Sequence, residues 1–325
     1  MNNKKQRLFT GIQPTGSLHI GNFLGAILPA VNRQDEYDSF LCVVDLHSIT
    51  KPYEPKDLRG QIKGVVLDYL AGGIDPNKST LFIQSHVPQH CELMWLLNTI
   101  TPVGELQRMI QYKEFKERFK EPQGGILNYP ILMAADVLLY KGEAVPVGDD
   151  QTQHIELMRD LAKKFNRIFG DTFPIPKNTV QNPLRIMSMH DPNKKMSKSL
   201  GPKSYIAISD SPDEIRKKIM SAVTGTDISM TAGTKNLFTL LEQVAPKDTY
   251  NHMYEKFENK DLQYSELKAV LADYMVEFVK PIQEKRAELE NNLDYIASIL
   301  AEGSERAREI ASETIEEVKQ KMGLM

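Results

Sequence analysis

The sequence of 325 residues predicts an α/β fold, with a parallel sheet in its first part and a helical region after it. In the first half, short apolar runs alternate with stretches of helical periodicity, and strand–helix–strand units of this length join parallel strands through right-handed crossovers. After about residue 205 the pattern is helical to the end. We therefore expect one domain at 1–204, with a helical insertion at about 90–142, and a helical domain at 205–325 whose last helix could pack back on the first domain.

The predicted sheet begins with the apolar run Leu8-Phe9-Thr10, which leads into a glycine-rich turn and then a helix. Residues 39–45 predict a buried strand that ends in a carboxylate. Residues 57–70 carry apolar side chains at helical spacing, Gly72-Gly73 ends that helix, and residues 80–84 predict the next strand. Because ligands of parallel sheets bind beyond the carboxyl ends of the strands, we expect a shared site from the polar residues that follow these ends: His19, Asp45, His47 and Gln84.

The second half predicts fewer strands. Residues 92–140 are mostly helical in pattern, residues 144–148 predict a strand, and a helix follows from about 151 to 169. Ser211-Pro212-Asp213-Glu214 predicts a helix start, with serine as N-cap, proline at the first helical position and glutamate as the capping-box partner. An acid-rich helix is expected from about 304 to 322.

Composition limits the classes of protein that remain. The 40 basic and 43 acidic residues give a net charge of −3, so any contact with nucleic acid must come from a local patch. Cys42 and Cys91 lie far apart, which suggests neither a disulfide framework nor a structural zinc site. The sequence shows neither a signal-peptide pattern nor an apolar run of membrane-spanning length, so we expect a cytoplasmic protein that does not enter the membrane.

Two short motifs carry the clearest chemical signal. Residues 11–22, Gly-Ile-Gln-Pro-Thr-Gly-Ser-Leu-His-Ile-Gly-Asn, lie between a strand and a helix, where backbone N–H groups and a helix N-terminus receive phosphate. Residues 194–201, Lys-Lys-Met-Ser-Lys-Ser-Leu-Gly, can bring positive charge to a polyphosphate. Each motif alone also fits a bland alternative, a tight turn for the first and a solvated basic loop for the second. The pair, in this order, is specific.

Together the two motifs resemble the HIGH and KMSKS signatures of class I aminoacyl-tRNA synthetases, whose catalytic domain has a Rossmann-type parallel sheet. The resemblance implies attack of an amino-acid carboxylate on the α-phosphate of ATP, with Mg²⁺ bridging the phosphates and catalysis resting on positioning and charge stabilisation. Asn22 replaces the second histidine of the first signature but still donates hydrogen bonds. The implied catalytic residues are His19, Lys195, Lys198 and Ser197, and the implied ATP-binding residues are Gln13, Pro14, Thr15, Gly21, Asn22, Gly148, Asp149, Asp150, Ile186, Lys195, Met196, Ser197, Lys198 and Ser199.

Residues 45–50, 129–140 and 148–156 narrow the resemblance to the tryptophanyl-tRNA synthetases, a family within class I, and the likeness extends over nearly the whole chain. It implies activation of L-tryptophan with ATP, transfer to tRNA(Trp), and a homodimer. It implies no permanent cofactor and no protein-bound metal. The implied tryptophan-binding residues are Asp136, Tyr129, Met133, Gln151, His47, Phe9, Val145 and Val147, with Tyr129 and Gln151 at the α-amino group.

The residues around Asp136 fit this substrate. Indole has one polar group, an N–H that only donates, so its pocket needs a buried acceptor. Asp136 lies in an apolar helical run where a carboxylate is costly unless it is paired, and Met133 and Tyr129 share its helix face. The alternative is a surface position on an amphipathic helix.

Several other assignments keep a plain structural alternative. Core packing explains Phe9 and the two valines equally well, and His47 could be a structural histidine. Asp149 and Asp150 could cap a helix instead of binding the ATP ribose. Four lysines of the helical region are available for tRNA phosphates, although they could be ordinary solvated side chains: Lys217, Lys218, Lys235 and Lys247.

Three other functions compete with tryptophan activation. A tyrosyl-tRNA synthetase shares the fold and chemistry, but its phenol pocket would offer an extra polar partner where Met133 lies. A nucleotidylyltransferase without tRNA fits less well with the loop at 194–201 and the long helical C-terminus. A non-catalytic RNA-binding paralogue fits poorly with the intact His19, Lys195 and Lys198.

Overall fold

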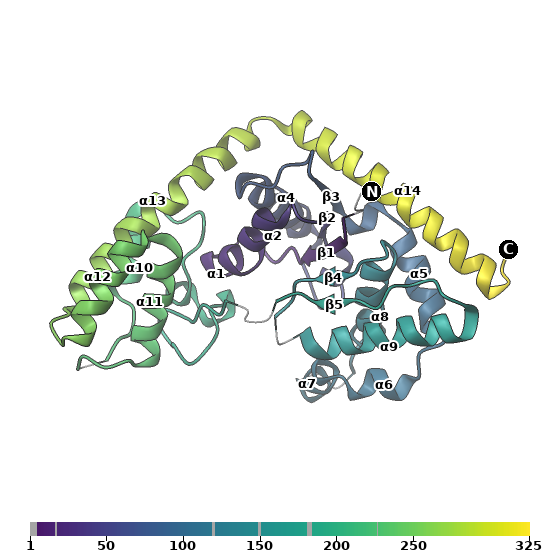
Figure 1. Cartoon of the computed structure of the whole chain (residues 1–325), viewed down its shortest axis with the longest axis horizontal. Coiled ribbons are helices and arrows are strands. Elements are labelled where there is room, and N and C mark those ends of the chain that lie inside the picture. The colour runs from purple at the N-terminus through teal and green to yellow at the C-terminus, as the bar shows by residue number, and fades with distance from the viewer. Residues whose placement is uncertain (1–4, 17, 119–120, 149–150, 181–183, 226) are drawn as a thin grey trace.

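The computed structural model describes residues 5–16, 18–118, 121–148, 151–180, 184–225 and 227–325. It contains a central parallel sheet with helices on both faces, a helical insertion below the sheet, and a helical region to one side (Figure 1). Within these residues, no helix is both long enough and apolar enough to cross a membrane. The α/β fold with a helical C-terminal region is confirmed.

The sheet has the strand order β3-β2-β1-β4-β5, and all four pairings are parallel. In chain order, the strands are β1 (Arg7–Ile12), β2 (Asp38–Val43), β3 (Ser79–Ile83), β4 (Ala144–Val145) and β5 (Lys177–Asn178). β4 is shorter than the predicted strand at 144–148, because Pro146 has no N–H to donate to a strand ladder. The chain reverses its direction of progress between β1 and β4, so this is the switch point at which such sheets bind ligands.

Each face of the sheet is covered by its own apolar cluster. Alternate residues of β2 point to opposite faces, so that Leu41 and Val43 belong to one cluster while Phe40 and Cys42 belong to the other. The first cluster extends into the helical region, and the second extends into the insertion and the helix after β4. The sheet is therefore buried on both sides, as parallel sheets require.

The helices of the first half connect the strands and form the insertion. A π-helical segment, η1 (Phe23–Ile27), separates two short α-helices after β1. The α-helices are α1 (Ile20–Asn22), α2 (Leu28–Arg33), α3 (Asp45–Ser48), α4 (Pro55–Ala71), α5 (Gln89–Asn98), α6 (Val103–Arg108), α7 (Ile110–Arg118), α8 (Gly124–Leu138) and α9 (Thr152–Phe169). Short 3-10 turns complete this part at η2 (Gln84–His86), η4 (Lys198–Leu200) and η5 (Pro202–Ser204).

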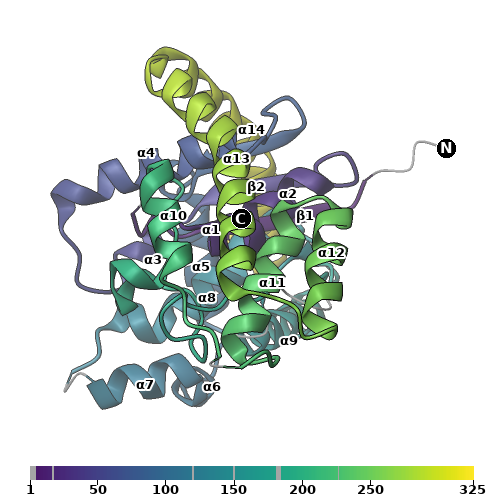
Figure 2. The same ribbon diagram turned by 90° about the vertical axis from the view of Figure 1, so that its left-hand side faces the viewer.

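The helical region is built around α13. Figure 2 shows α10, α11 and α12 grouped beside this long helix. The predicted capping box at the start of α10 is present, with both the Ser211 and the Glu214 hydrogen bonds formed. The helices are α10 (Pro212–Met220), α11 (Ala232–Val244), α12 (Lys247–Glu258), α13 (Tyr264–Glu290) and α14 (Leu293–Met322).

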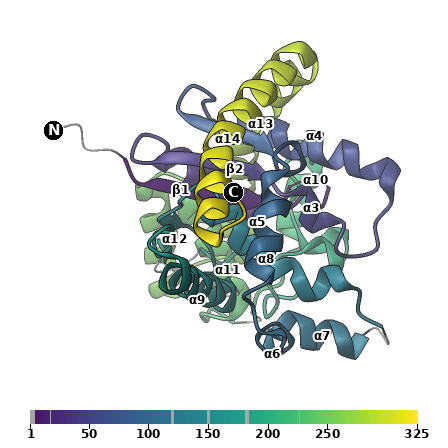
Figure 3. The same ribbon diagram turned by 90° about the vertical axis from the view of Figure 1, so that its right-hand side faces the viewer.

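Helices α13 and α14 form an arch over the molecule (Figure 1), and α14 returns along the sheet (Figure 3). α14 packs against β3, where a Cβ added to Gly303 would stand only 2.0 Å from the Leu81 carbonyl oxygen. This contact covers the edge strand, which would otherwise expose unpaired backbone groups. The domain boundary near residue 205 stays a prediction.

Candidate active site

A cavity of about 890 Å³ opens at the sheet switch point. Its walls include the end of β1, from Phe9 to Gln13, and Val145 at the end of β4. Helix α8 contributes Tyr129, Met133 and Asp136 from one face, as their spacing predicted. The cavity therefore lies where a parallel α/β sheet binds its ligands, beyond the carboxyl ends of two diverging strands.

Asp136 lines the part of the cavity to which α8 of the insertion contributes, and it is 1% exposed. Its Oδ1 atom accepts hydrogen bonds from Gln84 Nε2 at 2.6 Å and His90 Nδ1 at 2.6 Å, and its Oδ2 atom accepts one from His47 Nε2 at 2.8 Å. A surface position on an amphipathic helix, the alternative for Asp136, is wrong.

The carboxylate of Asp136 is held in its ionised form. Burial acts to raise its pKa, but the hydrogen bonds from His47 and His90 outweigh burial and hold the pKa well below its ordinary value. An ionised carboxylate offers about four acceptor positions, and the residues that the structure describes occupy three of them. One acceptor position remains for a ligand that donates.

The hydroxyl of Tyr129 is also nearly filled by protein partners. It donates to Gln111 Oε1, and its oxygen lies 2.8 Å from His154 Nε2. Burial is the largest cause of a raised pKa for Tyr129, so the hydroxyl stays protonated. A hydroxyl has one donor and two acceptor positions, so if His154 donates, a single acceptor position is left for a ligand cation.

His19 caps α1 and faces the cavity from the first motif. Its Nδ1 atom accepts a hydrogen bond from the Asn22 backbone N–H at 3.2 Å. Burial, followed by the charges of Lys198 and Lys195, lowers the pKa of His19 from 6.5 to about 4. The ring is therefore neutral at pH 7, and because Nδ1 accepts, the proton resides on Nε2.

The His19 ring leaves little room for a side chain at Gly21. A Cβ at Gly21 would stand 3.1 Å from His19 Nδ1 and 3.5 Å from Ile186 Cβ. A larger residue would therefore displace the ring or close the space between the first motif and Ile186, which both line the cavity.

The lysine-rich loop lies against the first motif. Lys198 Nζ donates to the Thr15 carbonyl oxygen at 3.0 Å, while Lys195 and Met196 line the cavity. Ser197 caps the short η4 turn, accepting from the Ser199 N–H, and its hydroxyl lies 2.9 Å from the Ser199 hydroxyl. The two serines therefore bond to each other in this arrangement, and neither lines the cavity.

Most of the predicted site residues come together in this one cavity. All eight predicted tryptophan-binding residues line it. The ATP set is divided: Pro14, Ser197, Lys198 and Ser199 are not among the lining residues, and Asp149 and Asp150 lie outside the described residues. The cavity lining contains the remaining members, namely Gln13, Thr15, Gly21, Asn22, Gly148, Ile186, Lys195 and Met196, together with His19.

Phe9 combines the functional position with the core position. It is 4% exposed, stacks on Tyr140 with ring centroids 5.8 Å apart, and still contributes to the cavity wall. Val145 is similarly buried and lines the cavity. Core packing and a place in the pocket wall are thus not exclusive for these two side chains.

Asp45 does not join the cavity, although it follows a strand end like His47. Its carboxylate accepts hydrogen bonds from the Ser85 backbone N–H and the Ser85 hydroxyl. Gln84 uses both ends of its amide, donating to Asp136 and accepting from the Leu46 N–H at 3.1 Å. Of the four strand-end residues expected to share a site, His19 and His47 line the cavity, Gln84 reaches it only through Asp136, and Asp45 stabilises the turn that positions Gln84.

Sequence reasoning assigned no role to His90, Tyr140, Gln111 or His154. Each of them contacts a predicted ligand-binding side chain or is one bond away from it. Gln111 and His154 come from α7 and α9, and nothing in the sequence places these helices beside Tyr129. Tyr140 ends the apolar run that contains Asp136, a position that could have drawn attention to it.

The four lysines of the helical region that were predicted to contact tRNA phosphates are not equally free to do so. Lys217, Lys235 and Lys247 are exposed. Lys218 donates to Asp210 at 2.6 Å and lies 5.0 Å from the Tyr205 ring centroid, so it is not available for a phosphate as the sequence suggested. No group of three or more His, Cys, Asp or Glu side chains within the described ranges is arranged to hold a metal ion.

Comparison with known proteins places this fold and cavity in a family. The family model for class I tRNA synthetases (W and Y) matches residues 1–280. The tryptophan–tRNA ligase of Clostridium acetobutylicum is 43% identical, covering 100% of this chain and 99% of its own. The tryptophanyl-tRNA synthetase structure of Mycoplasma pneumoniae superposes with a TM-score of 0.88 at 33% identity, covering 99% of this chain and 98% of that one. That of Campylobacter jejuni, complexed with ADP and tryptophan, gives 0.86 at 32% identity, covering 98% and 100%.

A parallel sheet with its ligand cavity at the switch point, and with the two motifs in contact with each other beside that cavity, defines a class I aminoacyl-tRNA synthetase. Within that class, the chain belongs to the bacterial-type tryptophan–tRNA ligase family.

Proposed function

We propose that this chain activates L-tryptophan with ATP, forming tryptophanyl-adenylate and pyrophosphate, and then transfers tryptophan to tRNA(Trp). The buried, ionised Asp136 with one acceptor position left is the observation that carries the proposal. Indole matches it, since its N–H can donate and cannot accept. Met133, on the same face of α8, packs well against an aromatic ring.

The amino-acid ammonium would lie near Tyr129 and Gln151, which both line the cavity. The remaining acceptor position of the Tyr129 hydroxyl suits a cation. This arrangement leaves the substrate carboxylate directed toward the ATP half of the cavity, where His19, Gly21 and Asn22 lie. Positioning of this kind removes most of the entropic cost of the reaction.

In the first step, a carboxylate oxygen of tryptophan forms a bond to the α-phosphorus of ATP, and the bond from that phosphorus to the bridging oxygen of the leaving pyrophosphate breaks. The carboxylate is already ionised, so no general base is needed. His19 would donate from Nε2 to a phosphate oxygen. Lys195 and Lys198 would balance the charge that develops on pyrophosphate, and Mg²⁺ would enter with ATP as part of the substrate.

The position of Lys198 supports its proposed role of balancing charge on the leaving pyrophosphate. In the structure it donates to the Thr15 carbonyl oxygen, at the turn where the phosphates are expected to bind. Burial lowers its pKa from the ordinary value, while the more distant Asp68 acts in the opposite direction. A polyphosphate would offer Lys198 a stronger, charged acceptor than a backbone carbonyl.

Two parts of the molecule, the helical region and the insertion, would contact macromolecular partners. The helical region after residue 205 would bind tRNA(Trp), with the exposed Lys217, Lys235 and Lys247 available for phosphates.

The insertion would form a homodimer interface, because Trp95, Val103 and Ile110 are 64%, 58% and 53% exposed on α5 to α7. A cytoplasmic setting fits the free thiols of Cys42 and Cys91.

Amino-acid-dependent ATP–pyrophosphate exchange, measured with each of the twenty amino acids, tests the proposal. We expect exchange with tryptophan only. Strong exchange with tyrosine would favour a tyrosyl-tRNA synthetase and overturn the role given to Asp136. Exchange without charging of tRNA would instead favour a nucleotidylyltransferase-like activity.

A further inference from the structure

Behind Asp136, away from the cavity, lies a second layer of buried polar residues. His90 is 0% exposed, and its two ring nitrogens bond to different partners: Nδ1 lies 2.6 Å from Asp136 Oδ1, and Nε2 lies 2.8 Å from the Tyr140 hydroxyl. Neither His90 nor Tyr140 lines the cavity. They nonetheless form a continuous hydrogen-bonded row that ends on the carboxylate of Asp136, which lines the cavity.

The direction of each bond in this row can be assigned. Asp136 is ionised and can only accept, so His90 Nδ1 carries a proton and donates to Oδ1. Burial raises the pKa of Tyr140 well above its ordinary value, so its hydroxyl keeps its proton. Among the described residues, that hydroxyl has a hydrogen-bond partner only in His90. A buried hydroxyl left without an acceptor is costly, so Tyr140 donates to His90 Nε2.

The row therefore runs Tyr140 O–H to His90 Nε2, and His90 Nδ1–H to Asp136 Oδ1. This arrangement places a proton of His90 on Nδ1, which faces Asp136, and makes Nε2 the acceptor for Tyr140, in the way that a buried partner orients a catalytic histidine. Gln84 fills the second acceptor position of Oδ1. Because both acceptor positions of Oδ1 are occupied, the free acceptor position belongs to Oδ2. This oxygen accepts a hydrogen bond from His47, and His47 lines the cavity.

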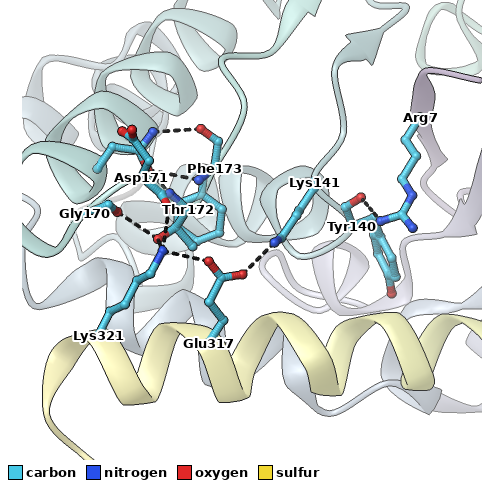
Figure 4. A network of polar contacts seen from close by, with 10 residues as sticks. Arg7, Tyr140, Lys141, Gly170, Asp171, Thr172, Phe173, Glu317 and Lys321 are labelled. Atoms are coloured by element: carbon cyan, nitrogen blue, oxygen red, sulfur yellow. Dashed lines mark hydrogen bonds and ion pairs between the residues drawn. The ribbon is translucent and has the colours of Figure 1, made fainter. Parts of the chain in front are cut away.

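The position of Tyr140 is itself tightly determined. Its ring stacks on Phe40 at a centroid distance of 4.7 Å, and its carbonyl oxygen accepts from Arg7 Nη1 at 3.0 Å. The next residue, Lys141, has a positive φ of 51° and donates to Glu317 of α14 at 2.6 Å. Figure 4 shows the hydrogen bond from Arg7 to Tyr140 and the one from Lys141 to Glu317 of α14. These contacts hold the Tyr140 ring and its backbone beside His90.

We propose that Tyr140 and His90 are positioning residues for amino-acid selection: Tyr140 sets the tautomer of His90, and His90 turns the Asp136 carboxylate so that Oδ2 receives the indole N–H. The inference rests on the proposed function, since it takes tryptophan as the substrate. It adds two residues that never touch the substrate but determine which oxygen is offered to it.

The test compares tryptophan with β-(3-benzothienyl)alanine, an isostere with sulfur in place of the indole N–H. ATP–pyrophosphate exchange gives kcat/KM for both, and their ratio measures use of the N–H acceptor. In Tyr140→Phe, His90 loses the partner that fixes its tautomer. We expect the tryptophan/isostere ratio to fall about 10-fold, the factor that corresponds to losing one hydrogen bond of ordinary strength. The kcat/KM for the isostere should change little.

Tyr69→Phe is the matched control. Tyr69 is equally buried in α4, and its hydroxyl has no partner among the described residues. Removing that hydroxyl should leave the ratio unchanged. A second pair addresses the middle of the row. His90→Asn keeps a donor near the position of Nδ1 and should retain most of the ratio, whereas His90→Leu should lower it at least as far as Tyr140→Phe.

The outcomes distinguish the proposed function from the positioning role of Tyr140 and His90. If the unmodified protein shows no exchange with tryptophan, the proposed function fails and this inference fails with it. If exchange is normal but Tyr140→Phe lowers kcat/KM equally for both substrates, the proposed function stands and the positioning role is wrong. Should Tyr140→Phe not fold, the His90→Asn and His90→Leu pair decides, with equal ratios in the two variants contradicting the inference.

Discussion

At the scale of single residues, the site depends on how each buried polar group divides its hydrogen bonds between protein and ligand. Asp136 has three donors from the protein, and His19 has one backbone donor at Nδ1. Such groups are costly to bury unless nearly all of their bonding capacity is used. Under the proposed function, the position that the described residues leave open on each group would give the cavity its chemical preference. Sequence pattern identified Asp136 from its apolar neighbours, but it could not identify the donors, which come from other helices and strands.

Asp136→Ala should weaken selection for tryptophan. Loss of a hydrogen bond to a charged group costs about 1.5–3 kcal/mol, so kcat/KM for tryptophan should fall by roughly 10- to 100-fold. Phenylalanine and tyrosine gain relative to tryptophan, because the unpaired acceptor that excluded them is gone. Exchange assays with the three amino acids measure this ratio, and thermal unfolding shows whether the variant is folded. Selectivity that survives the change unaltered would contradict the indole assignment.

His19 should make stability depend on pH below neutrality. Its pKa is about 4 in the folded protein against 6.5 ordinarily. Above pH 6.5 the ring is neutral in both states and contributes nothing. Between pH 6.5 and about 4 the unfolded chain binds a proton that the folded chain does not, so the free energy of unfolding falls as pH falls. The shift corresponds to a loss of about 3 kcal/mol.

His19→Asn removes the titrating group while keeping an acceptor near the Asn22 N–H. Urea unfolding of both proteins at pH 7 and pH 4 measures the effect. The unmodified protein should lose up to about 3 kcal/mol more than the variant over this interval. Acid effects from other carboxylates, including Asp136, occur in both proteins and cancel. Parallel stability curves would show that His19 is not held neutral by its surroundings.

At the scale of elements, local signals were sufficient where a segment's structure is decided by its own residues. The capping box at Ser211 formed as predicted, and the predicted strand at 80–84 corresponds to β3 within one residue at each end. The signals failed where distant contacts decide. α14 begins at Leu293, well before the acid-rich stretch, because its first turns pack Ile296 and Ile299 into the cluster shared with α13. Periodicity could not reveal that β3 would be its partner.

Gly303→Ala should destabilise the protein through the contact between α14 and β3. The added Cβ would stand 2.0 Å from the Leu81 carbonyl oxygen, and a backbone atom in a sheet cannot move aside easily. Overpacking of this kind costs about 1–3 kcal/mol. Chemical denaturation measures the change. Gly60→Ala is the control, since Gly60 lies in α4 with nothing within 4 Å of the added Cβ.

The two alanine substitutions should change the free energy of unfolding in opposite directions. In an exposed helix interior, alanine is favoured over glycine by about 0.5–1 kcal/mol, so Gly60→Ala should stabilise the protein slightly. Gly303 also lies within a helix and gains the same local preference, so any net loss there measures the packing contact. A stabilised Gly303→Ala variant would mean that α14 does not lie against β3 in solution.

At the scale of the whole molecule, α14 connects parts that the sheet separates. Its first half contributes to the cluster shared with the helical region, and its second half, through Ala307, Ala311 and Ile315, contributes to the cluster on the other face. The ion pairs from Arg306 to Asp38 and from Lys319 to Glu92 reinforce this path. The pattern of the last helix predicts that it packs back on the first domain, but the choice of face depends on residues more than two hundred positions away.

Trp95 is the single tryptophan of the sequence, and it is 64% exposed on α5 in the isolated chain. If the insertion forms the homodimer interface, Trp95 becomes buried and its fluorescence emission shifts to shorter wavelength. Dilution in the absence of substrate should then shift the emission to longer wavelength as dimers dissociate. Sedimentation velocity over the same concentrations checks that the spectral change follows the change in mass.

Trp95→Lys should produce a monomer at concentrations where the unmodified protein is a dimer, because a desolvated ammonium at the centre of an apolar interface is strongly unfavourable. Met220→Lys is the matched control, since Met220 is 45% exposed on α10 in the helical region, away from α5. It should leave the dimer intact. A monomeric unmodified protein at micromolar concentration, or a dimer that tolerates Trp95→Lys, would contradict the assignment of this face.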